Sequence, residues 1–84
     1  MWGLIAMDIE EAKTAILKRL YYDYKRWGRG FGIAAPAIQL ELKIPGEVFG
    51  EALSDLIVKH IFVEPVPGEA THIRLSEAGT LQCK

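Results

Sequence analysis

Hydrophobic residues recur at helical spacing in three stretches of this chain. Over about 8–27 they return every three or four residues, which predicts an amphipathic helix with one buried stripe. Shorter stretches with the same spacing predict two more helices, over 35–43 and 46–60. The pattern therefore indicates a small helical core before any other feature of the sequence is considered.

The residues between these stretches are typical of helix ends and tight turns. Asp8 and Glu11 have the spacing of a capping box at the start of the first helix, and Gly28 is expected to end it. Pro45 and Gly46 interrupt the helical pattern between the second and third helices. Two helices joined by so short a turn form a helix-turn-helix unit.

A change from helical to alternating spacing follows the third helix. Runs rich in β-branched residues at 61–64 and 70–75 flank a turn of proline and glycine, which predicts a β-hairpin over 61–75. A short edge strand is expected at about 31–34, where glycines precede an apolar run. Ser76 is expected to cap a final short helix.

The inward stripes of these elements define a predicted core. Its members are expected to be largely buried, and alanine at Leu53 in particular is expected to destabilise the domain. The predicted core residues are Ile16, Leu20, Ile38, Leu42, Val48, Leu53, Leu56, Phe62, Ile73 and Leu75.

Length and charge limit the classes of protein. Eighty-four residues with a net charge of −1 make one small domain without the overall basic character of many nucleic-acid-binding proteins. No apolar run approaches the roughly 18 residues that span a bilayer, so no membrane is expected as a partner. The lone Cys83 excludes an internal disulfide and favours a reducing compartment, so we expect a cytoplasmic protein.

The apolar stretch 1–7 is expected to be an arm outside the domain, which then covers 8–84. Such an arm either packs over the first helix or, because it carries Trp2, Leu4 and Ile5, forms a homodimer contact. A third possibility is that translation starts at Met7.

Candidate catalytic and metal-binding residues do not form a recognisable pattern. His60 and His72 lack the spacing of metal ligands, and Cys83 has no neighbouring base to lower its pKa. No nucleophile motif surrounds the serines. We therefore expect no enzyme activity and no cofactor.

The order of the predicted elements resembles a known family. Ala52-Leu53, Leu56, Ile61-Phe62 and the run 73–79 match the recognition-helix and hairpin pattern of winged helix-turn-helix transcriptional regulators. The resemblance implies an α+β fold with a three-helix core, a small antiparallel β-hairpin wing and a short C-terminal helix. His60 stands where the family usually has glycine, so a left-handed backbone is expected there.

The resemblance also implies binding to double-stranded DNA in transcription regulation. In that case four cations are expected to contact the phosphate backbone, and two residues of the third helix are expected to lie near the groove. The expected phosphate contacts are Lys43, Lys59, Arg74 and Arg29, and the expected groove residues are Phe49 and Ser54.

A second hypothesis follows from the charge of the third helix. Its predicted outward side carries Glu47, Glu51 and Asp55, which repel phosphates, together with apolar Phe49 and Val58. An acidic rim around apolar side chains suits a basic protein partner. The alternative is therefore a protein-interaction module of the same fold that does not bind DNA.

The first helix offers a third surface. Lys18, Lys25 and Arg26 alternate with Tyr21 and Tyr22 on its outward side. Basic residues interleaved with aromatic ones can hold a phosphate backbone and stack on bases, which would place a nucleic acid on the first helix, although such residues are also ordinary on a solvent-exposed helix. Both interpretations stay open.

Overall fold

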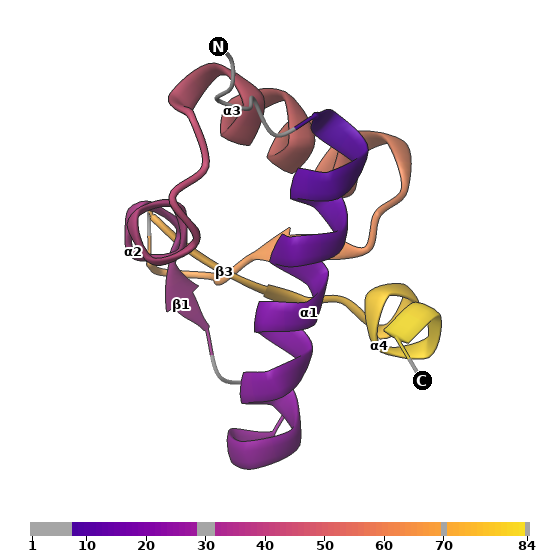
Figure 1. Ribbon diagram of the computed structural model, residues 1–84. Helices are drawn as coiled ribbons and strands as arrows, with labels where there is room; N and C mark the ends of the chain where they lie inside the picture. Colours follow the sequence, from indigo (N-terminus) through magenta and orange to yellow (C-terminus); the bar gives the residue numbers. More distant parts are fainter. Residues whose placement is uncertain (1–7, 29–31, 70, 84) are drawn as a thin grey trace, which may run out of the picture.

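The computed structural model describes residues 8–28, 32–69 and 71–83. In chain order the elements are α1 (Ile9–Trp27), β1 (Ile33–Ala34), α2 (Ala35–Leu42), α3 (Gly46–Ser54), the π-helical turn η1 (Asp55–Lys59), β2 (Val63–Pro65), β3 (His72–Leu75) and α4 (Glu77–Cys83) (Figure 1). The predicted helices and hairpin are confirmed to within a few residues. The N-terminal arm and Arg29 lie outside the described residues.

The ends of α1 form as the sequence predicts. The Asp8 carboxylate accepts a hydrogen bond from the Glu11 N–H at 2.7 Å, and the Asp8 N–H donates to the Glu11 carboxylate at 3.1 Å. These two bonds complete the capping box. Gly28, with φ at +94°, ends the helix, and its N–H donates to the Tyr24 carbonyl.

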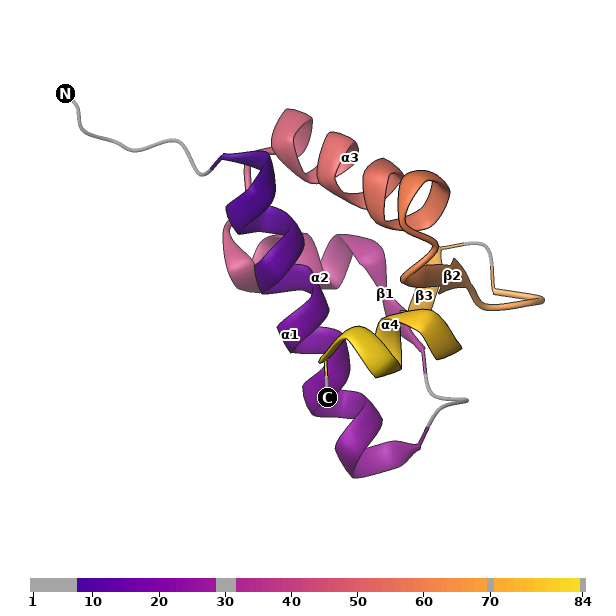
Figure 2. The same cartoon turned by 90° about the vertical axis from the view of Figure 1, so that its right-hand side faces the viewer.

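The three described strands form one antiparallel sheet in the order β1-β3-β2. Ile33 pairs with Ile73 on one side of β3, and Val63 pairs with Leu75 on the other. α1 packs against α2, α3, α4 and β3, so the first helix is the element on which the others assemble. Figure 2 shows α3 and α4 on either side of the small sheet. The described residues therefore form an α+β domain.

Most of the predicted core is confirmed, and the main difference is at the start of α3. Six of the predicted residues are buried, namely Ile16, Leu20, Ile38, Leu56, Ile73 and Leu75. The other four are half-buried at the margin of the core, namely Leu42, Val48, Leu53 and Phe62. The buried residues of α3 and η1 are Phe49, Ala52 and Leu56, so Phe49 is buried where the sequence pattern indicated Val48.

The π-helical turn changes how the third helix ends. The His60 N–H donates to the Asp55 carbonyl at 2.9 Å, five residues back rather than four. His60 therefore keeps a right-handed backbone with φ at −99°, and the expectation of a left-handed conformation there is wrong. The positive φ falls one residue later, at Ile61 with φ at +56°.

Ile61 is a strained residue, because a β-branched side chain disfavours the left-handed region. Its side chain is 61% exposed, so its removal loses little buried apolar surface. We expect Ile61→Gly to raise the free energy of unfolding by about 1 kcal/mol and the melting temperature by several degrees. Thermal unfolding followed by circular dichroism measures this.

Val58→Gly is the matched control, since it also removes an exposed β-branched side chain but at a helical position. Glycine within a helix is unfavourable, so this variant is expected to melt below the parent. If Ile61→Gly also melts below the parent, the backbone at Ile61 is not strained.

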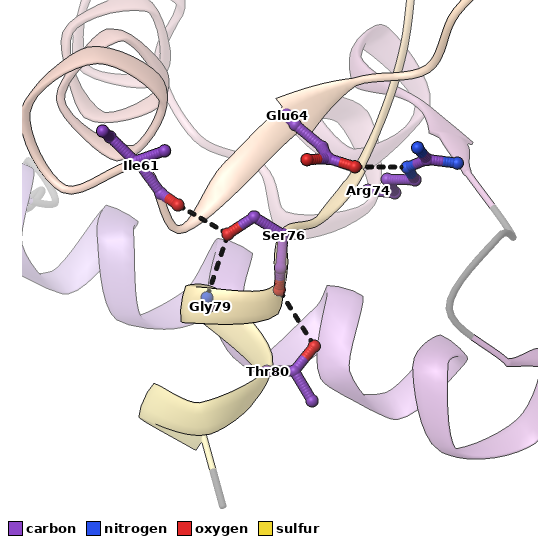
Figure 3. A network of polar contacts seen from close by, with 6 residues as sticks. All are labelled: Ile61, Glu64, Arg74, Ser76, Gly79 and Thr80. Carbon is purple, nitrogen blue, oxygen red and sulfur yellow. Dashed lines mark hydrogen bonds and ion pairs between the residues drawn. The ribbon is translucent and has the colours of Figure 1, made fainter.

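Ser76 joins α4 to the end of η1 (Figure 3). Its hydroxyl donates to the Ile61 carbonyl and accepts from the Gly79 N–H at 3.0 Å. Its own N–H donates to the Phe62 carbonyl at 3.0 Å, and its carbonyl accepts from the Thr80 hydroxyl. Ser76 therefore caps α4, as predicted, and also fixes the segment that follows η1.

Candidate functional site

The outward side of α3 and η1 is acidic and apolar. Its exposed side chains fall at i, i+4, i+7 and i+11, which places them on one stripe of the helix. We call this stripe the α3 face, and it consists of Glu47, Glu51, Ser54 and Val58, with Gly50 between them. The stripe has two carboxylates and no cation, and Val58 is 74% exposed.

Asp55 does not belong to the α3 face, contrary to the sequence-based expectation. Its carboxylate lies 3.3 Å from the Lys13 ammonium, which also contacts Glu10 at 2.9 Å and the His60 ring at 3.3 Å. The pKa of Lys13 is raised above its ordinary value, because Glu10 and Asp55 accept hydrogen bonds from the ammonium. Asp55 therefore joins η1 to α1 rather than facing a partner.

Phe49 is also absent from the α3 face. Its side chain is buried against the core because α3 turns its Phe49, Ala52, Leu56 stripe inward. Phe49 therefore reaches neither a DNA groove nor a protein partner, and both sequence-based assignments of this residue are wrong. Ser54, by contrast, is exposed as predicted.

Of the predicted phosphate contacts, the three within the described residues, Lys43, Lys59 and Arg74, come from three different elements. Lys43 is exposed in the turn after α2, and Lys59 is exposed at the end of η1. Arg74 lies opposite Glu64 across the hairpin, and its guanidinium donates to that carboxylate at 2.7 Å. The charge of Arg74 is therefore offset within the sheet.

A shallow hollow between the end of η1 and α4 was not predicted from the sequence. We call it the Ile61 hollow, and its lining residues are Ile61, Glu64, Ser76, Glu77, Ala78 and Leu81, around a volume of about 470 Å³. Leu81 is 64% exposed, so two large apolar side chains stand open to solvent beside the carboxylate of Glu77. The sequence signal that was missed is a leucine on the outward side of α4.

A groove runs between α1 and α4. Two adjoining hollows of about 290 and 210 Å³ share Thr14, Leu17 and Gln82. The Cys83 thiol lines the larger one and donates to the Leu17 carbonyl at 3.8 Å, and burial raises its pKa above the ordinary value. The groove thus holds a protonated thiol rather than a reactive thiolate.

The described residues show neither a metal site nor a membrane-spanning helix. Within 8–28, 32–69 and 71–83, no group of three or more histidine, cysteine, aspartate or glutamate side chains is arranged to hold a metal ion. None of the described helices combines the length and apolar character needed to cross a membrane. His72 instead lies 3.3 Å from Glu69 in the hairpin.

Comparison with known proteins finds no counterpart for this chain. No protein-family model matches it, and neither a curated protein nor a solved structure matches it significantly.

Proposed function

We propose that this chain is a winged helix-turn-helix domain. The element order α1, β1, α2, α3, β2, β3 supports this assignment, as does the sheet order β1-β3-β2, in which the first strand pairs with the last. The tight turn at Lys43 between α2 and α3 supports the helix-turn-helix unit. In this assignment α3 with η1 is the recognition helix, and the β2–β3 hairpin is the wing.

The function that the geometry supports best is docking of a basic protein segment on the α3 face and the Ile61 hollow. The observation that carries this proposal is the exposure of Val58, Ile61 and Leu81 beside carboxylates. Val58 ends the α3 face three residues before Ile61, which lines the hollow. Exposed apolar side chains rimmed by one sign of charge are typical of interaction sites.

DNA binding by the recognition helix is the second candidate, because helix-turn-helix units commonly bind duplex DNA. Lys43 and Lys59 are exposed and remain candidate phosphate contacts. Glu47 and Glu51 oppose this function, since they stand where the helix would approach phosphates. The charges of the described residues therefore favour the protein partner over duplex DNA.

A peptide-binding titration tests the proposal. Short fluorescent peptides rich in leucine and lysine are expected to bind the parent protein, with weaker binding at high salt. We expect Leu81→Glu to weaken this binding about tenfold, since residues that anchor an interface contribute more than about 1 kcal/mol. An acidic peptide of the same length, which should not bind, controls for non-specific association.

Leu40→Glu is the matched control variant, because Leu40 is also an exposed leucine but lies on α2, outside the lining of the hollow. It is expected to leave peptide binding unchanged. Equal losses of peptide affinity in Leu81→Glu and Leu40→Glu would contradict the proposed site. The DNA-binding candidate would instead be supported if the parent binds duplex DNA and if Lys43→Ala and Lys59→Ala both weaken that binding.

A further inference from the structure

The C-terminal half of α1 forms a second charged surface, far from the α3 face. Figures 1 and 2 both show this end of α1 at the opposite end of the molecule from α3. Its exposed side chains include Lys18, Lys25 and Arg26 and the rings of Tyr22 and Trp27, with Trp27 on the stripe of Ile16 and Leu20 but exposed at the last residue of the helix. We call these five exposed residues the α1 platform.

The cations of the α1 platform have no acidic partner among the described residues, a property they share with Lys43 and Lys59. Among the described residues, Lys18, Lys25 and Arg26 form no ion pair. The neighbouring Arg19, by contrast, is held by Asp23 at 2.7 Å and by Glu41 at 2.8 Å. The platform is therefore positively charged within a protein of net charge −1.

The aromatic rings of the platform are both exposed and held in place. Tyr22 is 53% exposed and Trp27 is 60% exposed. The Arg26 guanidinium lies 5.5 Å from the ring centre of each, and it donates to the Tyr22 hydroxyl at 2.8 Å. Lys25 lies 5.3 Å from the ring of Tyr21. Cations and ring faces therefore stand side by side in an ordered arrangement.

We propose that the α1 platform binds single-stranded nucleic acid. Lys18, Lys25 and Arg26 would contact successive phosphates, while unpaired bases stack on Trp27 and Tyr22. Single strands fit better than duplexes because their base faces are available for stacking on aromatic side chains. This site is independent of the α3 face, so the domain would hold a nucleic acid and a protein partner at opposite ends.

Fluorescence anisotropy with a labelled oligothymidylate, which has no secondary structure, tests the proposal. Trp27→Ala is expected to weaken binding roughly five- to a hundredfold without changing its salt dependence, because it removes stacking and no charge. Trp27→Phe is expected to retain most of the binding. Lys25→Ala and Arg26→Gln are each expected to lower the slope of log affinity against log salt by about 0.7.

Lys43→Ala and Lys59→Ala are the matched controls, since they remove exposed cations from other elements, the turn after α2 and the end of η1. They are expected to leave oligothymidylate binding unchanged. The proposal is overturned if Trp27→Ala binds like the parent, or if the control variants lose as much affinity as Lys25→Ala. Equal affinity for a duplex of the same length would also overturn it, since binding would then depend on charge alone.

Discussion

Gly79→Ala is expected to lower the free energy of unfolding by about 3 kcal/mol, near the upper end for overpacking substitutions. An added Cβ at this position would lie 1.9 Å from the Phe62 carbonyl oxygen and 3.1 Å from the Leu75 side chain. The first of these is a backbone atom fixed by its hydrogen bond from the Ser76 N–H, so it cannot move aside cheaply. Relief of the clash requires α4 to separate from the segment after η1.

Chemical denaturation of the parent protein and of Gly79→Ala measures the difference in their free energies of unfolding. Domains of this size have total stabilities of roughly 4–13 kcal/mol, so a loss of this size leaves Gly79→Ala partly unfolded or easily unfolded. Gly50→Ala is the control, because Gly50 is helical and its added Cβ would meet nothing within 4 Å. It is expected to stabilise the protein by up to about 1 kcal/mol. If both variants are equally stable, α4 does not pack as described.

Leu56→Ala is expected to lower the free energy of unfolding by about 2–5 kcal/mol, the range for leucine-to-alanine substitutions in packed cores. Leu56 is 1% exposed and lies in η1, where the third helix packs against the core. Removing its side chain leaves a cavity among residues drawn from several elements. Urea denaturation with tryptophan fluorescence or circular dichroism measures the loss.

Leu53→Ala tests whether Leu53 lies at the margin of the core, as the structure shows, or within it, as the sequence pattern indicated. Leu53 is half-buried at the margin of the core, so its loss is expected to cost clearly less than the loss of Leu56. A larger loss at Leu53 than at Leu56 would contradict the observed register of α3 and η1. The two substitutions are chemically identical, which makes the comparison independent of side-chain type.

The helices and hairpin were predictable because local chemistry determines them. The capping box at Asp8, the turn at Pro45 and Gly46, and the Ser76 cap are encoded within a few residues of the features they produce. Hydrophobic spacing then gave the inward stripes of α1 and α2. These signals depend on no contact between distant segments, so the sequence alone carries them.

The π-helical turn was not predictable in the same way. Because the turn contains one extra residue, the positive φ falls at Ile61 and not at His60, where it was expected. The spacing of hydrophobic residues does not indicate this extra residue. The sequence pattern indicated Val48 rather than Phe49 as a core residue for a related reason, since both are apolar. Only packing against α1 selects Phe49 as the buried one.

The candidate site was predicted only in part because its charges are paired across the fold. Glu47, Glu51 and Val58 are exposed as predicted, since their positions follow from helical geometry. Asp55 and Arg74 are not available to a partner in the same way, because Lys13 and Glu64 bind them. Those pairs depend on helix packing and strand register, which the sequence does not display.

The choice between a protein-docking and a DNA-binding recognition helix is tested most directly by nuclear magnetic resonance. A ¹⁵N-labelled sample is titrated at low salt with a short duplex of random sequence, and the amide shifts are followed residue by residue. We expect the amides of Glu47, Glu51 and Ser54 to stay unshifted, because the carboxylates of the α3 face repel phosphates. Saturable shifts at Glu51 and Ser54, accompanied by shifts at Lys43 and abolished by added salt, would contradict the protein-docking proposal.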